Sequence, residues 1–151
     1  MGESADFLKS EAMENKTALG QEWTTLQNNY ERYEIGALLV KLVAVVLFSA
    51  GVALALEPWF ICLVLLVLWL QEGIFKTYQS RLGERLLQVE RLLAAQPEGS
   101  GQAFQLHSTW LSRRTGAAGL LAEYAASACR PTVAFPYAVL VLAGLVLSLL
   151  N

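Results

Sequence analysis

Two charged residues stand alone in otherwise apolar stretches of this chain, and they are the first candidates for chemistry. Lys41 is the only charge within residues 35–56, and Glu72 is the only charge within residues 58–75. An unpaired charge within a membrane costs roughly 2.5–3.5 kcal/mol, so such residues either pair with a partner or form an ion or proton relay. Because each lies near one end of its stretch, we favour a structural pair in which Lys41 extends to the membrane surface.

The remaining reactive residue types form no pattern that predicts catalysis. The single histidine, His107, stands at an expected helix start, where an exposed or capping role is favoured. Cys62 lies within an apolar run and Cys129 precedes an arginine, so both are interpreted as free thiols. The sequence carries no HExxH, CxxC, phosphate-binding or dinucleotide-binding glycine motif. We therefore predict no enzyme activity, no catalytic residues, no metal site and no cofactor.

Composition places the chain in a membrane. Of its 151 residues, 55% are hydrophobic and 16% are charged, whereas a soluble domain carries about a quarter charged residues. Residues 35–56, 58–75 and 133–150 are each long enough to cross a hydrocarbon layer about 30 Å thick. The net charge of −2, with no cluster of lysine and arginine, argues against a nucleic-acid partner. Three transmembrane helices, with the lipid bilayer as partner, are the expectation.

A Glu57-Pro58 pair separates the first two apolar stretches. Proline has no amide hydrogen and is well tolerated at the first position of a helix. A glutamate immediately before it meets the positive end of the helix dipole. The pair is therefore predicted to form the tip of a tight transmembrane hairpin.

The lysines and arginines predict the orientation. Three precede the first span, seven lie between the second and third spans, and none lies at the hairpin tip or after the third span. The positive-inside rule then places the N-terminus and the middle segment in the cytoplasm, and the tip and C-terminus outside. The composition is typical of a bacterial inner membrane.

The polar flanks of the hairpin carry apolar residues at heptad-like spacing, which predicts that both helices continue as a cytoplasmic stalk. The predicted seam positions are Trp23, Leu26, Tyr30, Tyr33, Leu82, Leu86, Val89 and Leu93. A turn centred on Glu57 would place Tyr33 against Leu82 and Leu26 against Val89. The same register would place Arg85 near Glu31.

The predicted fold class is an all-α membrane protein with a transmembrane hairpin, an antiparallel coiled-coil-like stalk, a third cytoplasmic helix and a last span. The expected segments are an N-terminal cytoplasmic helix (1–34), the hairpin (35–75), a stalk helix (76–95), a linker (96–107), a helix rich in small residues (108–132) and the third span (133–151). Ser108 is the expected cap of the small-residue-rich helix.

The absence of a reactive motif favours a non-enzymatic scaffold or accessory subunit that acts through helix–helix association. A homo-oligomer or another membrane protein is the expected partner. The alternative is an oligomeric ion channel or pore-forming membrane effector.

Two resemblances bear on that alternative. The layout of residues 16–95 is similar to the pore subunit of the mitochondrial calcium uniporter, whose Trp-Asp-x-x-Glu-Pro signature lines a channel mouth. Only Glu57 and Pro58 match that signature; Ala53 and Leu54 stand at the tryptophan and aspartate positions, so the aspartate ring is absent. The layout also resembles the two-span SLATT-type effector domains, which implies a pore-forming role, although a third span departs from that pattern.

Overall fold

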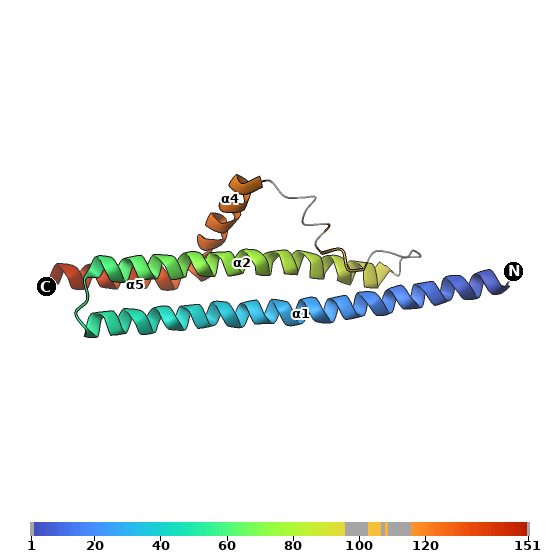
Figure 1. The fold of residues 1–151 in the computed structure, drawn as a ribbon, viewed down its shortest axis with the longest axis horizontal. Coiled ribbons are helices and arrows are strands. Elements are labelled where there is room, and N and C mark those ends of the chain that lie inside the picture. Colours follow the sequence, from blue (N-terminus) through green and yellow to red (C-terminus); the bar gives the residue numbers. More distant parts are fainter. Residues whose placement is uncertain (1, 96–102, 107, 109–115, 151) are drawn as a thin grey trace. The chain divides into compact units, whose positions relative to one another are not determined.

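The computed structural model describes residues 2–95, 103–106, 108 and 116–150. Within these residues there is no strand, and the helices are α1 (Gly2–Ala53), α2 (Pro58–Ala95), α4 (Gly116–Ala128) and α5 (Pro131–Leu150) (Figure 1). The predicted all-helical class is confirmed for this part of the chain. Most of the predicted linker, including His107, and residues 109–115 of the predicted small-residue-rich helix lie outside the described residues.

Helices α1, α2 and α5 are each long and apolar enough to cross a membrane. Many of their large aliphatic side chains face outward, including Leu38, Leu66 and Leu142, each more than half exposed. A protein surface of this kind is unfavourable in water and is the ordinary surface of a protein in lipid. The described helices therefore indicate an integral membrane protein.

The chain divides into two compact units, which we call the polar unit and the apolar unit. The polar unit comprises residues Met1–Arg32 and Gln79–Arg114, and the apolar unit comprises residues Tyr33–Tyr78 and Thr115–Asn151. Helices α1 and α2 each contribute one part to both units.

The polar unit packs the first part of α1 against the last part of α2. Its buried apolar side chains are Leu19, Leu26, Leu82, Leu86 and Val89. Their spacing of three, four or seven residues along each helix gives both helices one apolar face, which is what a two-helix contact requires. The ring of Tyr30 lies over Gly83, where an added Cβ would stand 3.4 Å from the ring.

The end of α1 adopts a geometry that terminates helices efficiently. The Leu56 amide donates to the Gly51 carbonyl at 2.9 Å, and the Ala55 amide donates to the Val52 carbonyl at 3.1 Å. This pair of bonds is the Schellman motif, and the residue it forces into the left-handed region is Ala55, with φ 51°. Helix α2 then begins at Pro58.

The position of this turn displaces the pairing of α1 with α2 from the predicted register. The turn residues between Ala53 and Pro58 are centred between Ala55 and Leu56, not on Glu57. Each residue of α1 therefore meets an earlier part of α2 than predicted. Tyr33 stacks on Tyr78, with ring centroids 6.1 Å apart, instead of lying against Leu82.

In the apolar unit, α1 and α2 lie side by side and α5 packs on them (Figure 1). Ala44, Leu65 and Tyr137, one from each helix, form the buried centre. The partly buried residues around it are Phe48, Ile61, Leu68, Trp69, Leu140 and Val141. Close approach at the tip of the hairpin depends on Gly51, where an added Cβ would lie 2.9 Å from the Ile61 side chain.

A short break separates α4 from α5, so the predicted helix over residues 108–132 does not continue to its expected end. Helix α4 ends at Ala128 and α5 begins at Pro131. Proline cannot supply the amide hydrogen that would continue α4, but it fits the first turn of α5. The Arg130 carbonyl accepts from the Val133 and Ala134 amides at 2.9 and 2.8 Å and so starts the new helix.

Candidate functional site

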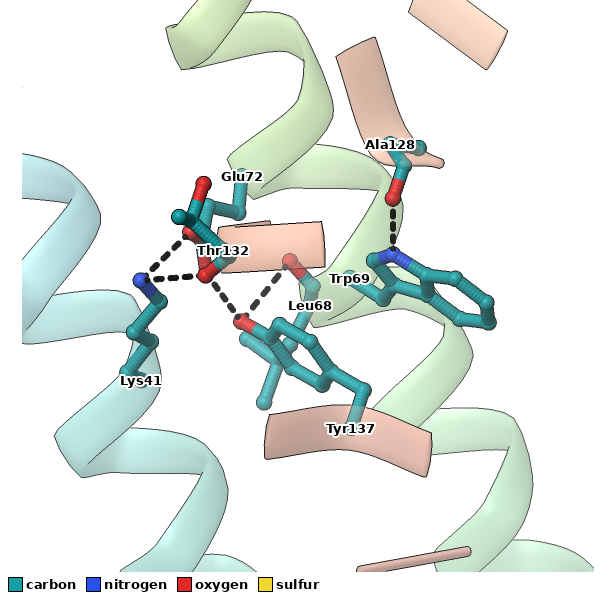
Figure 2. Close-up of polar contacts among 7 residues, drawn as sticks. All are labelled: Lys41, Leu68, Trp69, Glu72, Ala128, Thr132 and Tyr137. Atoms are coloured by element: carbon teal, nitrogen blue, oxygen red, sulfur yellow. Dashed lines mark hydrogen bonds and ion pairs between the residues drawn. The ribbon is translucent and has the colours of Figure 1, made fainter. Parts of the chain in front are cut away.

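The apolar unit contains a group of polar contacts at the junction of α1, α2, α4 and α5, drawn in Figure 2. We call it the polar cluster and define it by the side chains of Lys41, Trp69, Glu72 and Tyr137 with the carbonyl group of Thr132. Each helix that forms the core of the unit contributes at least one member.

Glu72 is at the centre of the polar cluster and is fully buried. The Lys41 ammonium group lies 3.0 Å from Glu72 Oε1, an ion pair in which Oε1 has no aligned hydrogen bond. The Tyr137 hydroxyl donates to Glu72 Oε2 at 3.0 Å. Both carboxylate oxygens therefore face a partner on another helix, which offsets the loss of hydration of the buried charge.

Lys41 has a second partner, the Thr132 carbonyl oxygen, at 3.1 Å (Figure 2). In a regular α-helix this carbonyl would accept from the amide of residue 136, four positions later. Residue 136 is Pro136, inside α5, and it has no amide hydrogen. The lysine therefore donates to the backbone acceptor that the proline leaves open.

Trp69 joins the same region to the end of α4. Its indole Nε1 donates to the Ala128 carbonyl oxygen at 2.8 Å. The last carbonyls of a helix have no partner within that helix, so this bond caps the C-terminal end of α4. The indole ring also stacks on Tyr137, with centroids 6.1 Å apart and planes 10° apart.

Small and hydroxylated residues bring α4 against α2 one turn further along. A Cβ added at Gly73 would lie 2.9 Å from the Cβ of Ala128, so glycine is required for this approach. The hydroxyl groups of Thr77 and Ser127, both buried, are 2.8 Å apart. Thr77 Oγ1 also lies 3.0 Å from the carbonyl oxygen of Gly73 on its own helix.

Taken together, these contacts tie α1, α2 and α5 to one another through Glu72. The structure brings Lys41 and Glu72, the two intramembrane charges expected from the sequence, to ion-pair distance. The row runs from the Tyr137 hydroxyl to the carboxylate through a hydrogen bond, and from the carboxylate to the Lys41 ammonium group through an ion pair. Chemically, such a row can hold a buried charge in place and fix the rotation of each helix about its axis.

The polar unit has a separate buried charge pair. Arg85 donates from Nε to Glu22 Oε1 at 2.8 Å and from Nη2 to Glu22 Oε2 at 3.0 Å, a bidentate arrangement. The backbone amide of Phe104 also donates to Glu22 Oε2, at 2.7 Å. The predicted register places Arg85 near Glu31, so Glu22 is a correction. The displaced turn sets Arg85 opposite Leu26, which is one helical turn from Glu22.

The other predicted positions are distributed as follows. Among the seam residues, Leu26, Leu82, Leu86 and Val89 are buried, and Trp23, Tyr30, Tyr33 and Leu93 are half-buried. At the tip, Glu57 is exposed and Pro58 is half-buried. Trp23 donates from its indole nitrogen to Glu90 Oε1 at 3.1 Å. Ser108 donates to the Gln105 carbonyl at 3.0 Å and is not at the start of α4.

Sequence reasoning missed Tyr137, Trp69 and Glu22. Tyr137 carries the one hydroxyl-bearing aromatic ring in the last apolar stretch, so a search for polar groups opposite Glu72 could have selected it. Glu22 gave no signal, because it is one of several glutamates in a polar segment. Among the described residues, no group of three or more His, Cys, Asp or Glu side chains could hold a metal ion.

Compared with protein families, with curated proteins and with solved structures, the chain gives no match.

Proposed function

We propose that this chain is a non-enzymatic scaffold or accessory subunit of a membrane, which acts by helix–helix association. In this proposal the apolar unit is the anchor and the polar unit is an antiparallel coiled-coil-like stalk in the cytoplasm. The distribution of lysine and arginine supports that orientation, with the hairpin tip and the C-terminus outside. A bacterial inner membrane is the proposed location.

The proposal is supported chiefly by the contacts of the buried Glu72 carboxylate. Glu72 is bound by Lys41 and Tyr137, and Lys41 is also bound to the Thr132 carbonyl. These ionisable groups lock three helices together, as expected of an anchor that must hold a fixed shape. A transport or catalytic role would need them to exchange partners with a substrate.

The proposed contact surface is on the polar unit. Phe7, Met13 and Leu87 are each more than half exposed there, although the unit buries other leucines efficiently. Exposed apolar side chains on a helical stalk are the usual contact points for another helix. The proposed partner is a second copy of this chain or another membrane protein.

Photocrosslinking in native membranes tests this proposal. A photoreactive amino acid at Leu87 is expected to give a discrete adduct, while the same group at Gln88, an exposed neighbour on a different side of α2, gives much less. Mass spectrometry of the adduct then distinguishes a second copy from another protein. Absence of an adduct at Leu87, Met13 and Phe7 alike would contradict the scaffold function.

A flux measurement on the purified protein distinguishes the channel or pore alternative from the scaffold proposal. Liposomes that contain the protein are expected to remain sealed to small cations. An oligomer that releases cations, and loses this activity on substitution of Glu57 by glutamine, would replace the scaffold proposal with the pore.

A further inference from the structure

Helix α4 has an exposed apolar face that its contacts within the apolar unit do not use. Its 13 residues contain one charged side chain, Glu123. Ala118, Leu121, Ala122 and Ala125 are all exposed, Leu121 at 66%. Their spacing of three, four and seven residues places them on one side of the helix, whereas Glu123 projects from the opposite side.

The attachment of α4 is confined to its C-terminal half. Ala128 lies against Gly73 and accepts the Trp69 hydrogen bond, and Ser127 meets Thr77. The Glu123 carbonyl oxygen lies 3.4 Å from Thr77 Oγ1. The residues of α2 that hold α4 are therefore those from 69 to 77.

This attachment coincides with the end of the outward-facing apolar surface of the unit. On α1 the exposed aliphatic side chains begin at Ile35, and on α2 within this unit they run from Leu63 to Leu70. Gly36, one residue after Ile35, lies against Phe75. The α2 segment that holds α4 is thus level with the boundary between the apolar surface and the polar part of the helices.

From this boundary α4 extends away from the other helices of the apolar unit. Figure 1 shows α4, in orange, attached near the start of α5 and extending away from α2 toward its own N-terminal end. Gly116, Ala117 and Ala118 at that end are exposed. A helix that leaves a membrane bundle at the boundary, with one apolar face, has the geometry of a helix lying in the bilayer interface.

We propose that α4 is an interfacial helix whose face of Ala118, Leu121, Ala122 and Ala125 contacts the lipid acyl chains. The occupant of this face is the bilayer because α4 is attached to α2 from Trp69 to Thr77, at the level where the outward-facing aliphatic side chains of α2 within this unit end with Leu70. The Glu123 side chain, which is exposed and lies outside this face, then reaches the headgroups and water. The inference rests on the membrane insertion of the apolar unit and adds a lipid-binding role for α4.

The test is the depth of a fluorophore on α4 in the reconstituted full-length protein. The native thiols are removed by Cys62→Ser and Cys129→Ser, and single cysteines are introduced by Ala122→Cys, Glu123→Cys or Leu142→Cys for labelling with an environment-sensitive dye. Vesicles of phosphatidylcholine and phosphatidylglycerol carry nitroxide-labelled lipids, and iodide is the aqueous quencher. Labelling at position 122 leaves Leu121 unchanged. The label at position 123, on the same helix, is the matched control for the label at position 122.

The dye at position 122 is expected to be quenched by lipid nitroxides near the headgroups, and several-fold less by iodide than the dye at position 123. Equal iodide quenching at positions 122 and 123 would overturn the inference. So would protection of position 122 without nitroxide quenching, since a second copy or another protein would then cover the face. Position 142 on α5 should respond to deeply placed nitroxides, which tests insertion of the spans separately.

Discussion

The Lys41 ammonium group donates to the Thr132 carbonyl oxygen at 3.1 Å, in the turn of α5 where Pro136 supplies no amide hydrogen. The same ammonium group pairs with Glu72 at 3.0 Å. One side chain of α1 thus satisfies a buried carboxylate of α2 and an open backbone acceptor of α5. A proline inside a membrane helix is tolerated where a neighbouring group replaces the missing bond, and here Lys41 does so.

The first prediction concerns the loss of this lysine. Lys41→Met keeps the length of the side chain but leaves the Glu72 charge with Tyr137 alone. We expect the free energy of unfolding to fall by about 3 kcal/mol, the lower end of the range for one lost partner of a buried ion pair, because Lys41 is 26% exposed. Reversible unfolding in mixed detergent micelles measures the change.

The double variant Lys41→Met/Glu72→Met is the control for that interpretation. Replacing both charges removes the desolvation penalty, so the double variant should be more stable than Lys41→Met alone. Stability within about 0.5 kcal/mol of the parent for Lys41→Met would show that the pair contributes little.

The second prediction isolates the tyrosine hydroxyl. Tyr137→Phe keeps the ring stacked on Trp69 and removes the donor to Glu72 Oε2. A hydrogen bond to a charged group contributes about 1.5–3 kcal/mol, so we expect a loss of that size in the same unfolding measurement. Tyr33→Phe, which keeps the ring contacts of Tyr33 with Phe75 and Tyr78, is the matched control and should change stability little. Equal effects of the two substitutions would argue against a specific role for the Tyr137 hydroxyl.

The third prediction concerns the contact of α4 with α2. In Gly73→Ala the new Cβ would lie 2.9 Å from the Ala128 Cβ and 3.2 Å from the Ala128 backbone. Overpacking of this kind costs about 1–3 kcal/mol, so the variant should be less stable although alanine favours helix. Gly20→Ala is the matched control, because nothing lies within 4 Å of its added Cβ, and it should gain up to about 1 kcal/mol. If both variants gained stability, the close approach of α4 would be disproved.

The helical class and the three apolar helices could be predicted because length and hydrophobicity are local properties of the sequence. Lys41 and Glu72 stood out for the same reason, since each is the only charge in its stretch. Tyr137, the other partner of Glu72, did not stand out in the sequence. It is distant along the chain, and a tyrosine in an apolar helix is equally consistent with simple packing. Identifying it requires the rotation of α5, which packing determines.

The register error has an equally specific origin. Glu57-Pro58 marks the start of α2, but nothing in the alanine-rich stretch before it marks the end of α1. Ala55 takes the left-handed conformation that glycine or asparagine normally provides, so the usual sequence signal for a helix end is missing. The earlier turn centre places Arg85 opposite Leu26 instead of Tyr30, and its side chain pairs with Glu22, one helical turn from Leu26.

The fourth prediction tests that partner. Glu22→Met removes the carboxylate that binds the Arg85 guanidinium and the Phe104 amide. Both side chains of the pair are almost fully buried, so a loss of about 3–5 kcal/mol is expected. In a hydrogen-exchange measurement, this loss of stability should appear as faster exchange of the α1 amides within the polar unit.

Glu31→Met provides the comparison for this measurement. Glu31 is exposed and accepts a hydrogen bond from Gln27 on its own helix. Its removal should therefore change the free energy of opening, measured by hydrogen exchange, by less than about 0.5 kcal/mol. A larger effect from Glu31 than from Glu22 would restore the pairing that the sequence predicted.

The fifth prediction concerns the helix end at Ala55. A left-handed conformation costs an L-residue with a Cβ roughly 1–2 kcal/mol, and glycine does not incur this cost. Ala55→Gly should therefore raise the free energy of unfolding by about 1 kcal/mol, whereas Ala53→Gly, inside the last turn of α1, should lower it by up to about 1 kcal/mol. Ala55→Val should be destabilising, because a β-branched side chain is worse still at positive φ. Thermal unfolding of the three variants in one detergent gives the order of stability. A gain for Ala55→Val with a loss for Ala55→Gly would mean that α1 does not end in a Schellman motif at Ala55.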